Sequence, residues 1–236
     1  MSSNYQSIQQ DYIKSIQIFN KEMISLQISI ISFIDDSTKI ESINDLLNQN
    51  NILNDEYKLN DFLQLLNSIS LSRFKPKEIN KLNEIISFLK PTLFEKFSQK
   101  DIFLIFKNNM PILLYLYENQ IIDFEPFLEY AQYDLYRFFL PEYVEHGKTE
   151  KLKYYFGDEI NEYITDLDGF KNKRKEYHSD LKIAKIIRDD DVDSFVDFVS
   201  HTNLDLNYKI PNSFFEINTD LQFMCSSLIE YSAVFQ

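Results

Sequence analysis

Cysteine is almost absent from this sequence, in which Cys225 is the single example. A disulfide within the chain is therefore impossible, and a cysteine-rich metal site is excluded. One unpaired thiol in a chain of this length suits a reducing compartment. The N-terminal residues also lack a basic stretch followed by an apolar one, so we expect no signal peptide. These absences predict a cytoplasmic, intracellular protein.

Glycine, proline and tryptophan are also scarce, with 3, 6 and 0 copies respectively among 236 residues. Folds built from strands and tight turns need glycine and proline at their turns, so their scarcity favours helices joined by short polar links. Hydrophobic residues make up 44% of the chain, which is enough for a substantial core and argues against global disorder. We therefore expect an all-α protein.

Positive charge is in deficit, because 24 Lys and Arg residues face 37 Asp and Glu residues, for a net charge of −13. This balance disfavours a general nucleic-acid binder, which needs a basic surface, and equally disfavours docking on an anionic membrane. The longest uncharged apolar segment, residues 23–34, contains three serines and a glutamine and is too short to cross a bilayer. We expect neither nucleic acid nor membrane as a partner.

The N-terminal segment is predicted to form one long helix over about residues 4–34. Its apolar residues alternate in steps of four and three, which is the heptad pattern of a coiled coil. The chain could dimerise through this seam, or the helix could pack along its own solenoid. Four further isoleucines at 13, 24, 28 and 31 widen the apolar face and favour packing within the chain. The seam residues are Tyr12, Ile16, Phe19, Met23, Leu26, Ile30 and Phe33.

The middle of the chain predicts successive short helices. The Asp35–Thr38 segment is expected to end the long helix and cap the next, and Pro91 is expected to stop a helix that begins at Pro76. A helical hairpin then spans residues 98–118, and a second one residues 143–160, with Gly147 at its turn. Residues 161–178 are predicted to be a polar connector.

Residues 179–207 give the clearest hairpin pattern. Ser179 is expected to cap a first helix whose buried face includes Ile183, and Asp189–Asp191 begin a second helix, where negative charge suits the helix dipole. The second helix is predicted to bury Val192, Phe195, Val196 and Val199 on one face. So small a hairpin cannot bury its own apolar face, which predicts an α-solenoid of stacked helical hairpins.

At these residues the chain resembles ankyrin-repeat proteins. It is more closely similar to the N-terminal region of a large protist family in which a helical region of unknown function precedes the repeats. The resemblance covers most of residues 55–236. Together with the heptad pattern, it predicts a long N-terminal helix at residues 1–36, a helical region of unknown function at 37–178, and degenerate ankyrin-like repeats at 179–236, the last one incomplete. It is carried by Phe97–Phe103, Leu113–Tyr117, Leu181–Ala184, Ile187–Phe195, Leu204–Asn207 and Ser227–Phe235.

Candidate reactive residues do not converge in the sequence. His146, His178 and His201 are scattered, without cysteine or paired carboxylates at metal-ligand spacing, and Cys225 has no neighbouring histidine to activate it. The aspartates from Asp189 to Asp197 do not match a calcium-binding loop, which needs glycine and glutamate where this sequence has serine at 194 and 200. We therefore predict no catalytic residue, metal site or cofactor.

These patterns favour a non-catalytic scaffold that binds an unidentified protein, as the ankyrin resemblance also implies. Exposed first-helix positions such as Lys182 and Lys185 are the expected contact points. The basic cluster at residues 171–175 could be a nuclear signal or a contact for an acidic partner, but a solvated connector is the favoured interpretation. The alternative function is self-association through the heptad helix, where replacing Met23 and Leu26 with glutamate should lower the mass in solution.

Overall fold

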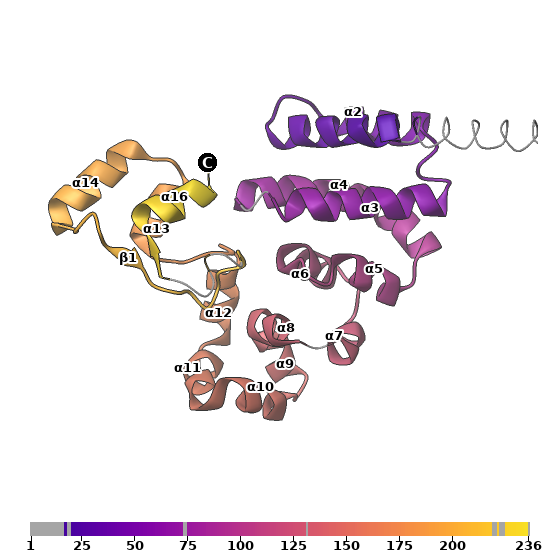
Figure 1. Cartoon of the computed structure of the whole chain (residues 1–236). Helices are drawn as coiled ribbons and strands as arrows, with labels where there is room; N and C mark the ends of the chain where they lie inside the picture. The colour runs from indigo at the N-terminus through magenta and orange to yellow at the C-terminus, as the bar shows by residue number, and fades with distance from the viewer. Residues whose placement is uncertain are drawn as a thin grey trace, which may run out of the picture. The chain divides into compact units, whose positions relative to one another are not determined.

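A computed structural model of the chain describes residues 17, 20–72, 75–130, 132–218, 221 and 225–235, with residues 159 and 162 described in their backbone alone. These residues are mostly helical, and their two short strands pair with each other (Figure 1). The predicted all-α class is therefore confirmed.

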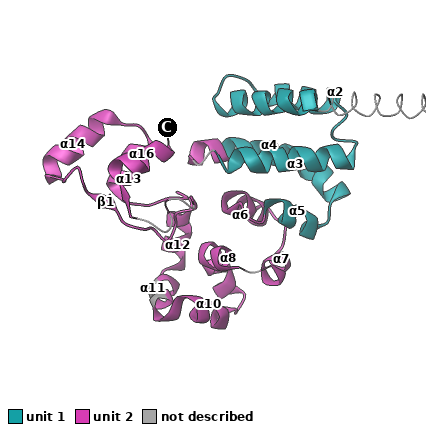
Figure 2. Ribbon diagram, viewed as in Figure 1, with its two compact units in different colours: residues 1–73, 80–106 teal, residues 74–79, 107–236 magenta. Residues whose placement is uncertain are grey.

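The chain divides into unit 1 (residues 1–73 and 80–106) and unit 2 (residues 74–79 and 107–236), and both share helix α4, Pro76–Lys96 (Figure 2). The predicted boundaries after residues 36 and 178 stay predictions.

From residue 20 onward, unit 1 consists of a helix over residues 20–34, α2 (Ile40–Gln49), α3 (Glu56–Ser70), the larger part of α4, and α5 (Gln99–Phe106). Asp55 caps α3 by accepting hydrogen bonds from the backbone N–H groups of Tyr57 and Lys58. The amide of Asn67 on α3 donates to the carbonyl of Ile105 on α5 at 3.0 Å. The helices close over buried Leu26, Ile30, Phe33, Ile43, Leu47, Phe62, Leu63, Leu66, Leu82, Ile85, Ile86, Leu89, Leu93, Phe103 and Phe106.

Two predictions about unit 1 are wrong. The Asp35–Thr38 segment ends the first helix but does not cap α2, whose N-cap is Lys39 and has no side-chain hydrogen bond. Helix α4 continues through Pro91 to Lys96. A proline inside a helix costs about 3 kcal/mol. The burial of Leu89 and Leu93 on either side of it contributes about 1.5–3 kcal/mol each, which offsets that cost.

The described part of the heptad seam packs inside unit 1. Leu26, Ile30 and Phe33 are at most 2% exposed. Ile24 and Ile28, which were expected to widen the buried face, are instead 56% and 60% exposed. The seam positions Tyr12, Ile16 and Phe19 lie outside the described residues.

The first part of unit 2 is a run of short helices: α6 (Met110–Glu118), α7 (Glu125–Glu129), α8 (Tyr133–Phe138), α9 (Leu140–Glu145), α10 (Thr149–Phe156), η1 (Gly157–Glu159), α11 (Ile160–Ile164) and α12 (Leu167–Arg174). Pro111 lies in the first turn of α6. As predicted, Gly147 forms the turn between α9 and α10, with φ +68°. Aromatic rings fill this core, where Phe127 contacts Phe139 at a centroid distance of 4.5 Å.

The predicted polar connector at residues 161–178 is wrong, because α11 and α12 occupy much of it. Asp166 caps α12 by accepting a hydrogen bond from the backbone N–H of Gly169 at 2.8 Å. Phe170 and Arg174 lie on one side of α12 and are 3% and 1% exposed. The buried residues of α12 are one phenylalanine and one arginine. Because arginine is usually exposed, the sequence of α12 looks polar although the helix packs against the core.

The last part of unit 2 contains α13 (Lys182–Arg188), α14 (Val192–Thr202), β1 (Lys209–Ile210), β2 (Ser226–Ser227) and α16 (Leu228–Val234). The strands are antiparallel, with Lys209 opposite Ser227 and Ile210 opposite Ser226. They bring α16 back against α13. The elements share a core of Ile183, Ala184, Ile210, Leu221, Leu228, Tyr231 and Phe235.

Candidate functional site

The turn between α13 and α14 is built by three consecutive aspartates. Asp189 ends α13, Asp190 adopts a left-handed backbone conformation with φ +54°, and Asp191 is the N-cap of α14. The Asp191 carboxylate accepts a hydrogen bond from the backbone N–H of Ser194 at 3.0 Å. Hydrogen bonding from Ser194 lowers the pKa of Asp191, so this carboxylate stays ionised. The prediction that this acidic run begins the second helix is confirmed.

The expected cap of α13 is wrong. Its N-cap is Leu181, with no side-chain hydrogen bond, and Ser179 is 2% exposed beneath the helix. The Ser179 carbonyl accepts a hydrogen bond from the Arg188 guanidinium at 2.9 Å, and the same nitrogen donates to the Tyr231 hydroxyl at 2.9 Å. Arg188 therefore ties both ends of α13 to α16 from the inside.

Helix α14 does not bury the face that its sequence predicts. None of its residues is fully buried, and Val192 and Val196 are 66% and 56% exposed. Phe195 and Phe198 instead pack, half-buried, against the core shared with α13 and α16. Helix α14 makes its main helix contact with α13. One turn of its predicted apolar face is left open.

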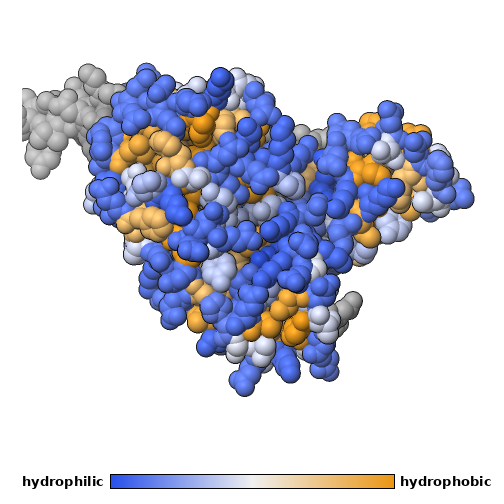
Figure 3. All heavy atoms as spheres, turned by 180° about the vertical axis from the view of Figure 1, so that it is seen from behind, coloured by the Kyte–Doolittle hydropathy of each residue, from blue (hydrophilic) through white to orange (hydrophobic). Residues whose placement is uncertain are grey.

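This open face forms one wall of an apolar groove between α13, α14 and α16, with a volume of about 360 Å³. Ile229 on α16 is 80% exposed at its margin, and Leu206, in the turn after α14, is 65% exposed. Hydrophobic residues lie exposed among hydrophilic ones over these C-terminal elements (Figure 3). The groove is lined by Ile186, Ile187, Asp190, Asp191, Val192, Phe195, Leu206, Leu228, Ile229 and Ser232.

The margin of the groove is acidic. Asp190 and Asp191 line it, Asp193 and Asp197 follow on the exposed side of α14, and no cation among the described residues forms an ion pair with any of these four. Glu230, next to Ile229 on α16, forms a capping box with Ser227. The hydrogen bonds from Ser227 lower the pKa of Glu230, which keeps a further negative charge beside the groove.

The neighbouring cations make contacts within the chain, and Lys209 on β1 contributes to the lowered pKa of Glu230. Arg188, the last residue of α13, has a buried side chain, and Lys185 forms an ion pair with Glu176 at 3.1 Å. Lys182 lies over the ring of Phe198, 5.5 Å from its centroid. Lys182 and Lys185, the contact points expected from the sequence, thus make contacts within the chain and are not among the residues that line the groove.

A buried ion pair in unit 2 was missed by sequence reasoning. The Arg174 guanidinium donates two hydrogen bonds to the Glu142 carboxylate, both at 2.6 Å, with both side chains at most 3% exposed. It also donates to the carbonyl of Phe138 at 3.0 Å. This contact joins α9 to α12 across 32 residues of sequence, and no local pattern signals it.

A second buried polar contact holds the segment before α16. His178 Nδ1 lies 2.7 Å from the Glu216 carboxylate, and both side chains are at most 2% exposed. Arg137 on α8 donates hydrogen bonds to the carbonyls of Phe214 and Glu216 at 2.7 and 2.8 Å. These bonds fix the loop that carries the chain from β1 towards β2, and they do not face the groove.

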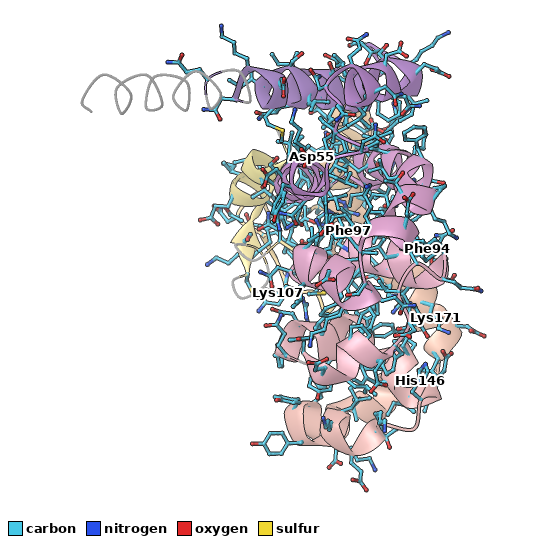
Figure 4. All side chains as sticks on the ribbon, turned by 90° about the vertical axis from the view of Figure 1, so that its right-hand side faces the viewer. Asp55, Phe94, Phe97, Lys107, His146 and Lys171 are labelled. Atoms are coloured by element: carbon cyan, nitrogen blue, oxygen red, sulfur yellow. The ribbon has the colours of Figure 1, made fainter. Side chains whose placement is uncertain are left out.

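The other candidate residues stay apart from one another. His146, which is labelled in Figure 4, lies at the end of α9 and stacks on Phe124 with a centroid distance of 4.1 Å. His201 bonds within α14 to the Asp197 carbonyl. Cys225 is exposed. In the part of the chain that the structure describes, no three His, Cys, Asp or Glu side chains are grouped as metal ligands.

The basic cluster of residues 171–175 is bound to carboxylates within unit 2. Lys171 pairs with Glu145, Lys173 with Asp180, and Lys175 with Glu118. Arg174 is the buried partner of Glu142. An acidic partner would have to compete with these intramolecular pairs.

Comparison with known proteins found no matching family model, no matching curated protein and no matching solved structure. The resemblance to ankyrin-repeat proteins therefore stays a prediction. Over the described ranges, the helices are too short or too polar for any of them to traverse a lipid bilayer. The groove, with its acidic margin, is the strongest candidate functional site.

Proposed function

We propose that the chain is a non-catalytic protein-interaction scaffold that binds a protein partner through the groove between α13, α14 and α16. The carrying observation is the face of α14, where Val192 and Val196 follow the spacing of a buried helix face but are 66% and 56% exposed. A contiguous exposed apolar surface with a polar rim is typical of a protein-interaction site. Three of the apolar residues at the groove, Val192, Leu206 and Ile229, are at least 65% exposed.

The arrangement of the C-terminal elements supports an ankyrin-type helical repeat. Helix α13 packs against both its hairpin partner α14 and the following helix α16, as the first helices of successive stacked repeats do. The chain between them forms a two-stranded antiparallel pair, β1 with β2. On this proposal, the loop between β1 and β2 is an insertion that makes this unit longer than the ~33 residues of a regular repeat.

The lining of the groove favours binding over catalysis. Its polar groups are two aspartates and one serine, and hydrogen bonds lower the pKa of Asp191. A general acid or base works best with a pKa near the operating pH, which for a carboxyl group requires a raised pKa. The buried Arg174–Glu142 and His178–Glu216 pairs are enclosed in the core of unit 2 and provide rigidity to the scaffold.

Site-specific photo-crosslinking tests this function. A photoreactive phenylalanine analogue replaces Ile229 in the full chain, and the matched control carries it at Ile28, which is 60% exposed on unit 1. Both proteins are irradiated in an extract of the cells that express the chain. The proposal predicts a defined crosslinked protein at position 229 that is absent at position 28. Equal crosslinking at both positions, or none at 229, contradicts it.

Self-association remains the second candidate, on the observation that Ile24 and Ile28 are exposed one turn apart on the first helix. Because Leu26 is fully buried, its replacement by glutamate would unfold unit 1 instead of separating subunits. The appropriate test replaces Ile24 and Ile28 with glutamine and compares the masses by light scattering. An unchanged monomeric mass for both proteins removes this candidate.

A further inference from the structure

The groove between α13, α14 and α16 has the form of a helix-binding surface. On α14, Val192, Phe195 and Val196 follow one another at i, i+3 and i+4, and on α16 Ile229 and Ser232 lie three residues apart. Such rows are the ridges between which a third helix packs. The apolar surface also extends past the hollow, because Val196 is exposed although it does not line the groove. A small molecule that filled the hollow would leave this extension uncovered.

The charges around the groove specify the flanks of that helix. Five acidic residues around the groove are exposed: Asp190 and Asp191, which line it, Asp193 and Asp197 on α14, and Glu230, which follows Ile229 on α16. On α13, Lys185 and Arg188 both pair with Glu176, at 3.1 and 3.8 Å, and neither lines the groove. Lys209 on β1 acts on Glu230 alone among these carboxylates, so the aspartates are left without a paired cation among the described residues. Complementary charges fix orientation and speed association, so the fitting ligand carries positive charge on both sides of its apolar stripe.

A second copy of the chain is a poor occupant for the same reason. In a symmetric dimer the same patch faces itself, so the aspartates of one α14 would approach those of the other. Each copy also carries a net charge of −13, which opposes association at low salt. The charge that excludes a second copy attracts a basic segment.

We propose that the groove binds an amphipathic helix of a partner protein, with aliphatic anchors on one face and lysine or arginine residues flanking it. This inference rests on the proposed scaffold function and narrows it to one class of ligand. The aliphatic anchors of the helix occupy the space between Val192, Phe195 and Ile229. Its basic flanks lie against the aspartates of α14 and against Glu230.

The test uses three fluorescent synthetic helices of roughly 18 residues, or five turns, that share one leucine pattern at i, i+3, i+4 and i+7. Their flanking positions carry lysine, glutamine or glutamate. Fluorescence anisotropy measures their binding to the full chain at about 50 and about 500 mM salt, where screening differs strongly. We expect the lysine helix to bind at least tenfold more tightly than the glutamate helix at low salt, and this difference to shrink at high salt.

Matched variants locate the site. Ile229→Gln should weaken binding of the lysine helix at least fivefold, whereas Ile28→Gln, at a similarly exposed isoleucine of unit 1, should leave it unchanged. Asp190→Asn combined with Asp193→Asn should weaken the lysine helix and not the glutamine helix, whereas Asp61→Asn on unit 1 should affect neither.

The outcomes separate the two proposals. Tighter binding of the lysine helix that is lost in Ile229→Gln supports both. Equal binding of all three helices that is lost in Ile229→Gln keeps the scaffold and overturns the basic ligand. Binding that Ile229→Gln leaves unchanged, or no binding by any helix, overturns the inference, and the crosslinking experiment then decides the scaffold function separately. A doubled mass that is lost in Ile229→Gln would identify a second copy as the occupant and also overturn it.

Discussion

Replacing Glu142 with glutamine should strongly destabilise unit 2, because it removes one charge of a buried pair and leaves the other. Both hydrogen bonds from the Arg174 guanidinium to Glu142 measure 2.6 Å, and the two side chains are 1% and 3% exposed. The guanidinium also lies over the rings of Phe138 and Phe139, at 5.6 and 5.7 Å from their centroids. Little water reaches it to replace the lost carboxylate.

The expected cost follows from this geometry. A glutamine amide offers one oxygen acceptor, and its NH₂ group would face the donors of Arg174. Breaking a buried ion pair by removing one partner costs about 3–5 kcal/mol. That loss is a large fraction of the roughly 5–15 kcal/mol by which a native protein is stable. The control is Glu145→Gln, which breaks the ion pair between Glu145 and Lys171. The side chains of Glu145 and Lys171 are 48% and 30% exposed. Exposed pairs contribute at most about 1 kcal/mol.

Urea unfolding followed by far-UV circular dichroism measures both changes. We expect the unfolding midpoint of Glu142→Gln to fall well below that of Glu145→Gln. The double variant Arg174→Met with Glu142→Leu should recover much of the loss, because it leaves no unpaired buried charge. If Glu142→Gln costs no more than Glu145→Gln, the pair is not enclosed as described and the reasoning fails.

Three further predictions concern the same unit. Burial raises the pKa of Tyr177 from 10.0 to about 12. The stability that comes from keeping this hydroxyl protonated is therefore complete below pH 10 and is lost as the pH rises through about 12. Tyr177→Phe should flatten the fall of the melting temperature over that range, and an unchanged dependence of the melting temperature on pH would contradict this. Gly147 adopts φ +68°, and the space where an added Cβ would lie is open. Gly147→Ala should therefore lower the free energy of unfolding by about 1 kcal/mol through backbone strain alone. An unaltered urea midpoint would rule that out. Val192→Gln and Ile229→Gln should each change the free energy of unfolding by less than about 0.5 kcal/mol, because both side chains are exposed. Leu228→Ala, at a buried residue, should cost about 2–5 kcal/mol. A large effect of either glutamine would show that Val192 or Ile229 supports the fold.

The helices were largely predictable because their signals are local. Asn109 and Pro111 mark the start of α6, and the Asn109 side chain accepts the hydrogen bond from Ile112 that the cap requires. The aspartates at 189–191 likewise mark the boundary between α13 and α14. Capping and turn chemistry depend on residues within four positions of each other, so one sequence suffices to find them.

The failures depend on contacts made by residues far apart in the chain. Helix α4 passes Pro91 because Leu89 and Leu93 are buried in unit 1, and Arg174 is buried because Glu142 meets it from another helix. The groove was missed because residues expected to make contacts within the chain are instead exposed. Periodicity in α14 predicts that Val192 is buried, but it does not say whether this chain or another molecule covers it.

Hydrogen exchange of the full chain, measured by mass spectrometry with and without the lysine-flanked helix, tests the central claim most directly. The account predicts slower exchange in α14 and α16 when the helix is present, no change in unit 1, and no slowing with the glutamate-flanked helix. Slowing confined to other parts of the chain, or equal slowing with both helices, would contradict it.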